Sequence, residues 1–243
     1  WQYGETVYPV GSEMPAATSD MTFTAQYGEK MVAKVGETEY ATLEAAVNEA
    51  NGQTVTLINN TAEDLPVNGT LNLDLNGKKV SGATYVNGTL NIVGSGELDT
   101  MYIYGKVNVS ANVVLNGELF VQGTESAKAE LNLTNATVTL KKLGNETVGE
   151  AELAGYAVLK LQNSTFHVDN KETTKYFCVG SYCDLYFDAG SKLIVDTQRS
   201  MKFATDGSLS IYVDIDGMAA GDTSLIYVAY ENGFHQDVSI AYL

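Results

Sequence analysis

The sequence is short of positive charge. Its 243 residues include 14 lysines and arginines against 30 aspartates and glutamates, giving a formal net charge of −16, and Arg199 is the one arginine. Binding to phosphate groups needs clustered Lys and Arg, so this composition argues against a nucleic-acid partner and against an anionic membrane surface. We interpret the excess of carboxylates as a solvated surface that keeps the protein soluble.

Long apolar runs and cysteines are also scarce. No run approaches the roughly 20 residues that span a bilayer, so we expect no membrane insertion of this segment. No secretory signal is visible and the chain begins at Trp1 instead of Met, so we interpret it as a fragment of a longer protein. Cys178 and Cys183 are too few for a disulfide framework or a four-cysteine zinc site. They flank a corner at Gly180-Ser181, where either a disulfide or two buried free thiols would fit.

What the sequence does contain is a repeated strand pattern. Alternating apolar triplets recur every 17 to 28 residues and begin at Leu71, Leu90, Val107, Leu131, Leu159, Leu185 and Leu209. Alternation with a period of two, nested inside a longer period, is typical of a solenoid of stacked β-strands. The unequal spacing favours a right-handed parallel β-helix, whose corner loops vary in length, over a strict hexapeptide repeat. A β-sandwich is the main alternative, because strands about 8–12 residues apart suit that architecture too.

One helix is expected, over residues 42–51. Thr42 is a suitable N-cap, Glu44 favours the positive N-terminal end, and the apolar residues fall on one face. Gly52 then ends the helix. A helix in this place would cover the first coil, where a β-helix otherwise exposes its core and unpaired strand edges. The fold class predicted is therefore all-β: a parallel β-helix with a short N-terminal capping α-helix.

Two segments resemble known families. The stretch VGETEYATLEAAVNEANGQTVTLI is similar to the N-terminal cap of pectin-lyase-like β-helices. The opening WQYGETVYPVGSEMPAATSDMTFTAQY resembles the second half of a Listeria–Bacteroides (InlB B-type) repeat, through Trp1, Val10-Gly11, Met14-Pro15 and Thr22-Phe-Thr-Ala25. The resemblances imply a truncated repeat or linker at residues 1–30, a β-helix at 31–243, and an extracellular location at a bacterial cell surface. Few cysteines and many Gly, Tyr, Asn, Thr and Ser suit a Gram-positive surface protein.

The pectin-lyase-like resemblance raises the question of enzyme activity. Lyases of that fold pair Ca²⁺-binding aspartates with an Arg or Lys base. In this sequence Arg199 follows three aspartates: Asp184, Asp188 and Asp196. These residues would form either such a catalytic group or a solvated ion pair. The Asp-Asp, GHG and R-x-K motifs typical of the hydrolases are absent. Glycoside hydrolysis needs two carboxylates that face one bond, and no motif here supplies them. We therefore assign no catalytic residue.

Metal sites and cofactors receive no assignment either. His167 alternates with apolar neighbours and is expected to point outward from a strand, and His235 lies in a terminal loop. The stretch Asp214–Asp222 lacks an early ligand and the closing Glu of an EF-hand, so a strand and turn are the favoured interpretation.

Tyrosines are the remaining candidates for binding. Alternation predicts that Tyr102, Tyr104, Tyr186 and Tyr212 face outward, where tyrosines of stacked coils would form a ladder against sugar rings. Tyrosine is also a good strand residue without any such role. Asn-x-Thr/Ser triplets beginning at Asn68, Asn87 and Asn163 are interpreted as corners, where Asn-Gly tolerates positive φ.

These observations favour a monomeric, non-enzymatic module of a bacterial surface protein that binds a glycan or another extracellular protein. A polysaccharide lyase or hydrolase is the first alternative. A passive structural stalk is the second. Clustered carboxylates beside a basic residue in a groove would favour the enzyme. Stacked tyrosines that face outward would favour a binding role, and a surface without either feature would favour the stalk.

Overall fold

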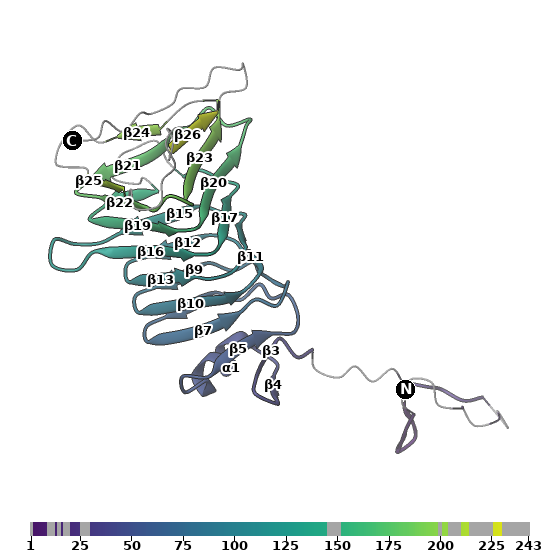
Figure 1. Ribbon diagram of the computed structural model, residues 1–243. Helices are drawn as coiled ribbons and strands as arrows, with labels where there is room; N and C mark the ends of the chain where they lie inside the picture. Colours follow the sequence, from purple (N-terminus) through teal and green to yellow (C-terminus); the bar gives the residue numbers. More distant parts are fainter. Residues whose placement is uncertain are drawn as a thin grey trace. The chain divides into compact units, whose positions relative to one another are not determined.

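The structure is a computed structural model that describes residues 2–8, 13, 16, 20–24, 30–144, 152–198, 201–203, 210–213 and 226–229 (Figure 1). It divides into two compact units, Trp1–Lys30 and Met31–Leu243. In the first unit, β1 (Gln2–Tyr3) and β2 (Thr6–Val7) form an antiparallel hairpin, and Gln2 also bridges to Thr24. The rings of Tyr3 and Tyr8 pack on Phe23, at centroid distances of 5.4 and 6.1 Å.

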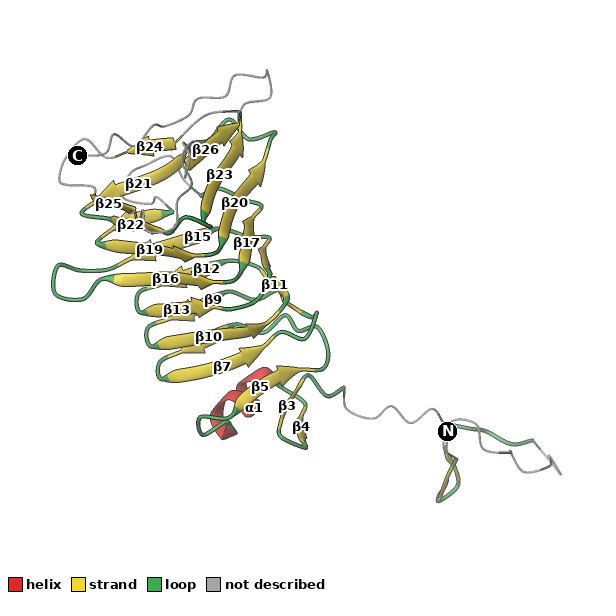
Figure 2. Ribbon diagram, viewed as in Figure 1, coloured by secondary structure: helices red, strands yellow, loops and turns green. Residues whose placement is uncertain are grey.

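The second unit is built from coils of three strands, stacked one on another (Figure 2). Each coil supplies one strand to each of three sheets, and strands of successive coils pair in parallel. This arrangement confirms the predicted all-β parallel β-helix and excludes the β-sandwich. Among the described residues, no helix is long and apolar enough to cross a membrane.

The three sheets are named in the order in which the chain passes through them. Sheet 1 contains β25 (Ser210–Val213), β22 (Asp184–Phe187), β19 (Ala157–Gln162), β16 (Ala129–Thr134), β13 (Lys106–Val109), β10 (Thr89–Gly94), β7 (Thr70–Asp74), β5 (Thr54–Leu57), β3 (Ala33–Val35) and β4 (Thr38–Tyr40). Sheet 2 contains β26 (Ile226–Ala229), β23 (Lys192–Thr197), β20 (Thr165–Asn170), β17 (Thr137–Leu140), β14 (Val113–Leu115), β11 (Gly96–Leu98) and β8 (Lys79–Val80). Sheet 3 contains β24 (Met201–Phe203), β21 (Phe177–Ser181), β18 (Leu153–Gly155), β15 (Leu119–Gln122), β12 (Met101–Ile103), β9 (Thr84–Val86) and β6 (Leu65–Val67).

The apolar triplets of the sequence are the strands of sheet 1. The first six pair in register, through Leu71, Leu90, Val107, Leu131, Leu159 and Leu185. The seventh prediction is wrong by two residues, because Leu185 pairs with Ile211 and not with Leu209. A slip of two residues keeps every side chain on the same face of a strand, so alternation alone does not fix this register.

The core fills the space enclosed by the three sheets. The inward residues of the sheet 1 row from Leu71 to Leu185 are at most 4% exposed, and they meet equally buried rows from sheets 2 and 3. Burying each such leucine contributes about 1.5–3 kcal/mol. Among the described residues, Thr84 of sheet 3 is fully buried and its Oγ1 has no hydrogen-bond partner.

The N-terminal end of the solenoid is covered by α1 (Leu43–Glu49) and by the hairpin β3–β4, which pairs antiparallel with β5. Oγ1 of Thr42 accepts a hydrogen bond from the Ala45 N–H at 3.2 Å, as expected of an N-cap. The carboxylate of Glu63, from the first coil, accepts further bonds from the first helical N–H groups. The helix ends two residues earlier than predicted, because Asn51 adopts a φ of 46°.

The corner between sheets 3 and 1 depends on close backbone stacking. An added Cβ on Gly88 would lie 2.2 Å from the carbonyl oxygen of Gly69 in the coil before it. The side chain of Asn87 donates to that of Asn68 at 2.9 Å. Neither asparagine has the positive φ that was expected, whereas Asn163, at another corner, has a φ of 46°. Gly88 is thus needed for space at this corner, whereas an added Cβ on Gly69 would meet no atom within 4 Å.

The outer face of sheet 1 carries a row of hydrogen-bonded asparagines. The amide of Asn91 donates to Asn72 at 2.8 Å, Asn108 donates to Asn91 at 2.7 Å, and Asn132 donates to Asn108 at 3.1 Å. Each of these bonds joins one coil to the next. The outer face of this sheet is therefore polar and internally satisfied over its first coils.

Candidate functional site

Aromatic side chains gather on the outer face of sheet 3. Tyr85 on β9, Tyr102 on β12 and Phe120 on β15 are register neighbours in three successive coils. Tyr104 lies two residues after Tyr102, at the corner that leads to sheet 1. We call Tyr85, Tyr102, Tyr104 and Phe120 the aromatic surface.

Local sequence explains why these rings point outward. In each of the three strands the aromatic residue lies between two buried residues, as in Met101-Tyr102-Ile103, and successive side chains of a strand face opposite sides. The core side of the pleat is taken by the flanking residues, so the rings stand on the solvent side. Tyr85 and Tyr104 are 39% and 45% exposed, which makes them large exposed hydrophobic residues.

The rings contact one another in two ways. Tyr85 and Tyr102 are stacked, with centroids 5.1 Å apart and planes 10° apart. Phe120 meets Tyr102 and Tyr104 edge to face, at 6.3 and 6.1 Å. Such ring pairs contribute about 0.5–1.5 kcal/mol beyond their buried area. The aromatic surface is therefore a connected cluster held in place by the coils beneath it.

Charged groups adjoin this cluster. The Lys142 ammonium lies 2.9 Å from Oε1 of Glu118, the residue that immediately precedes β15. Burial raises the pKa of Tyr102, and nearby Tyr85 and Glu118 add to that shift, so its hydroxyl stays protonated at neutral pH. The hydrogen bond to Glu118 raises the pKa of Lys142. The surface thus combines aromatic rings with an ion pair at its rim.

The four tyrosines predicted to form one ladder lie on two different sheets. Tyr102 and Tyr104 belong to the aromatic surface. Tyr186 lies on β22 of sheet 1, where its register neighbours are Lys160 and Tyr212. The backbone of Tyr212 is described, but its side chain lies outside the described residues. The single ladder is therefore corrected to one aromatic surface on sheet 3, with Tyr186 and Tyr212 apart from it.

Sequence reasoning missed Tyr85 and Phe120. Both show the signal that identified Tyr102, an aromatic residue between two apolar or small ones in a three-residue alternation. The missing knowledge was the register of sheet 3, which places these strands beside that of Tyr102.

A second aromatic pair occupies the same corner as Tyr104 in later coils. Tyr156 and Tyr182 are stacked at 4.8 Å with planes 11° apart. Both have positive φ, 48° and 60°, which is rare for a bulky residue. Their stacking helps to offset that backbone strain.

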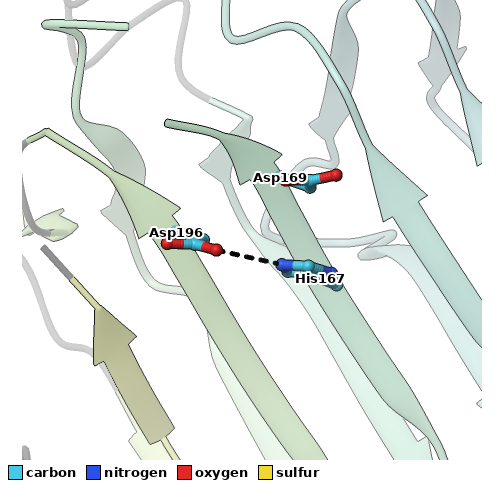
Figure 3. Close-up of side chains that lie close together, drawn as sticks. All are labelled: His167, Asp169 and Asp196. Atoms are coloured by element: carbon cyan, nitrogen blue, oxygen red, sulfur yellow. Dashed lines mark ion pairs between the residues drawn. The ribbon is translucent and has the colours of Figure 1, made fainter. Parts of the chain in front are cut away.

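His167, Asp169 and Asp196 form a polar cluster on the outer face of sheet 2 (Figure 3). His167 and Asp169 come from β20, and Asp196 comes from the neighbouring strand β23. Their potential ligand atoms lie within 4.8 Å of one another, a spacing within which three donors are able to share a metal ion. His167 faces outward as predicted, with 28% of its side chain exposed and its Nε2 3.8 Å from Asp196.

Lysines already neutralise both carboxylates of this cluster. Lys141 pairs with Asp169, and Lys171 lies 3.2 Å from Asp196. The hydrogen bond from Lys141 lowers the pKa of Asp169. A divalent cation would have to displace two ammonium groups, so the cluster acts as an ion-pair network that joins the three successive coils of β17, β20 and β23.

The aspartates considered for lyase chemistry do not share one face. Asp184 lies on sheet 1 and pairs with Lys128, whereas Asp196 lies on sheet 2. Asp188 accepts hydrogen bonds from Asn163 N and Ser191 Oγ at a corner. Their expected partner Arg199 lies outside the described residues, as do His235 and residues 214–222.

Two cysteines and one glutamate are also buried. Cys178 and Cys183 form no disulfide, and both side chains are fully buried, as in the second of the two alternatives. Glu152 is also fully buried, and its carboxylate accepts hydrogen bonds from Gly144 N at 2.9 Å and Cys178 N at 2.8 Å. Burial raises the pKa of Glu152, although these N–H donors oppose the shift. Its role is structural, because it holds one loop against strand β21.

Comparisons of the chain with protein-family models, with curated proteins and with solved structures found no match.

Proposed function

We propose that this chain is a non-enzymatic binding module of a bacterial cell-surface protein and that it holds an extracellular glycan or protein on its aromatic surface. The observation that carries the proposal is the gathering of four aromatic side chains from three coils on one face of sheet 3. Exposed apolar clusters with a polar rim mark interaction sites on soluble proteins. Tyr and Phe are also enriched in the energetically important centres of interfaces.

The proposed location has its own support. Residues 1–27 resemble an InlB B-type repeat, a spacer of bacterial surface proteins, and residues 35–58 resemble the cap of pectin-lyase-like β-helices. A net charge of −16 suits a protein that must stay soluble outside the cell. A rigid solenoid would present the aromatic surface to ligands at a fixed place on its side.

The test is a binding screen of the whole chain against immobilised glycans and purified extracellular-matrix proteins. A ligand found in the screen is then measured with a double variant, Tyr102→Ala with Phe120→Ala, and with a matched control, Tyr186→Ala. Truncating two central aromatic contacts is expected to weaken binding at least tenfold, while the control changes it less than about twofold.

Other outcomes would overturn the proposal. If the Tyr186→Ala control loses as much affinity as the double variant, the ligand does not bind specifically at the aromatic surface. If neither the glycans nor the matrix proteins bind, a structural stalk is favoured. New double bonds or reducing ends released from a polysaccharide by the wild-type chain would show an enzyme.

A further inference from the structure

The ring geometry of the aromatic surface bears on the class of its ligand. A sugar ring packs its C–H groups against the open, electronegative face of an aromatic ring. Tyr102 has an aromatic neighbour in each adjacent coil, since Tyr85 stacks on it at 5.1 Å and Phe120 meets it edge to face at 6.3 Å. The ring presents its edge and its hydroxyl instead. This arrangement favours a ligand that contacts ring edges and donates hydrogen bonds to phenol oxygens.

Carboxylates border the same surface along one side. Asp64, Asp99 and Glu118 stand in the last two positions before β6, β12 and β15, at the corner where the chain enters sheet 3. Asp64 is exposed, and Asp99 and Glu118 are half-buried. Strand register aligns Asp64 with Glu118 three coils later, and Asp99 stands one position before the equivalent residue of its own coil. The coil of β9 has Gly82 and Ala83 at this corner. We call Asp64, Asp99 and Glu118 the acidic border.

The chain's own Lys142 shows how a cation fits here. Its ammonium bonds to Glu118, and the nearby charges of Glu118 and Asp99 and the Tyr102 phenol all favour its charged form. The side chain remains more than half exposed. One ammonium group therefore already lies between the acidic border and the rings. Asp64 and Asp99 have no lysine or arginine in an ion pair among the described residues.

We propose that the ligand of the aromatic surface is a basic polypeptide segment, whose lysine or arginine side chains pair with Asp64 and Asp99 and lay their aliphatic stems along Tyr85 and Tyr102. The inference rests on the proposed function and names its ligand class. Long basic side chains cover apolar surface while their charged ends stay in water. The complementary charge of the whole chain, −16, speeds the encounter.

The experiment measures binding of a short fluorescent peptide of alternating lysine and glycine to the full chain. A peptide of alternating glutamate and glycine and a neutral oligomer of β-1,4-linked N-acetylglucosamine serve as comparison probes. The double variant Asp64→Asn with Asp99→Asn removes two of the three carboxylates of the acidic border and leaves Glu118, the partner of Lys142, in place. The control Glu37→Gln with Glu39→Gln removes the same charge from exposed positions at the β3–β4 hairpin. Asp64 Oδ1 accepts a bond from Ala83 N, and the Asn replacement retains that acceptor.

The lysine peptide is expected to bind, the glutamate peptide is not, and the Asp64 and Asp99 variant should bind the lysine peptide about tenfold more weakly. If the Glu37 and Glu39 control weakens lysine-peptide binding equally, the effect comes from net charge alone and the inference is wrong. Binding of the neutral sugar that depends on Tyr102 and Phe120 but not on Asp64 and Asp99 would also overturn it, while leaving the proposed function intact. Lysine-peptide binding unaffected by the Tyr102→Ala and Phe120→Ala variant would contradict both.

Discussion

The stacked corner glycines allow a sharp test of how the coils pack. Replacing Gly88 with Ala puts a Cβ 2.2 Å from the carbonyl oxygen of Gly69 and 2.8 Å from the carbonyl carbon of Asn68. Ordinary contact begins near 3.4 Å, so the two coils must separate by about 1 Å at this corner. Backbone atoms cannot yield as the end of a flexible side chain does.

The cost has two parts. Overpacking strain amounts to about 1–3 kcal/mol. The shift also weakens the bonds from Gly88 N to Val67 O and from Thr89 N to Gly69 O, now 2.9 and 2.8 Å, each worth about 0.5–1.5 kcal/mol. We therefore expect Gly88→Ala to lower the free energy of unfolding by about 2–4 kcal/mol. Urea unfolding followed by circular dichroism should show the midpoint lowered by about 1–2 M.

Gly69 supplies the matched control, because an added Cβ there meets no atom within 4 Å. Neither glycine has positive φ, so backbone strain does not separate the two substitutions. Gly69→Ala should leave stability unchanged or raise it by up to about 1 kcal/mol, through a less flexible unfolded chain. If both alanines cost the same, or if Gly88→Ala costs less than about 0.5 kcal/mol, the stacking argument is wrong.

Four further outcomes are expected. Thr84→Val should raise the free energy of unfolding by about 1 kcal/mol in denaturant titrations, because it removes a buried hydroxyl without a partner and keeps the side-chain shape. A lower free energy of unfolding would mean that the hydroxyl makes a hydrogen bond. Asn91→Ala should cost about 1–2 kcal/mol in the same assay, since it breaks two side-chain bonds between coils, and a neutral result would mean that water replaces them. The raised pKa of Glu152 means that this carboxyl binds a proton more tightly in the folded than in the unfolded state. The contribution of Glu152 to the free energy of unfolding therefore grows as pH falls from neutral to the ordinary glutamate range. Glu152→Gln should flatten that part of a curve of unfolding free energy against pH. The lowered pKa of Asp169 has the opposite sign, because its contribution is present above the ordinary aspartate range and is lost as pH falls through the folded pKa. Asp169→Asn should therefore cost about 0.2–1 kcal/mol at pH 7, and the cost should shrink as pH falls below the ordinary aspartate range.

The fold was predictable because one sheet repeats itself clearly. The triplets from Leu71 to Leu185 gave six correct register positions, since each has an apolar residue, a polar residue and another apolar residue in equivalent places. The error at Leu209 has a simple physical origin, because Leu209 and Ile211 share a strand face and both satisfy the alternation. The helix start was predictable from Thr42, whereas its end at Glu49 depends on the left-handed conformation of Asn51.

The site was predictable only in part. Alternation placed Tyr102 outward, but grouping it with Tyr85 and Phe120 needs the register of strands only three or four residues long. The corners that connect these strands vary in length, so sequence spacing does not show which residues become neighbours. Tyr186 has the same outward alternation as Tyr102 but belongs to a different sheet, so alternation alone does not group outward tyrosines into one surface.

The serial order of the coils determines how the second unit would respond to mechanical force. Each coil pairs with the preceding and following coils through short strands, so tension applied at the chain ends would load one terminal coil at a time. On sheet 1, register partners of successive coils lie between 17 and 28 residues apart, as for Leu90 with Val107 and Leu131 with Leu159. Detaching one such coil releases about 55–95 Å of chain. Extension would therefore proceed in small separate steps, each reversible while the remaining coils provide a template for rewinding.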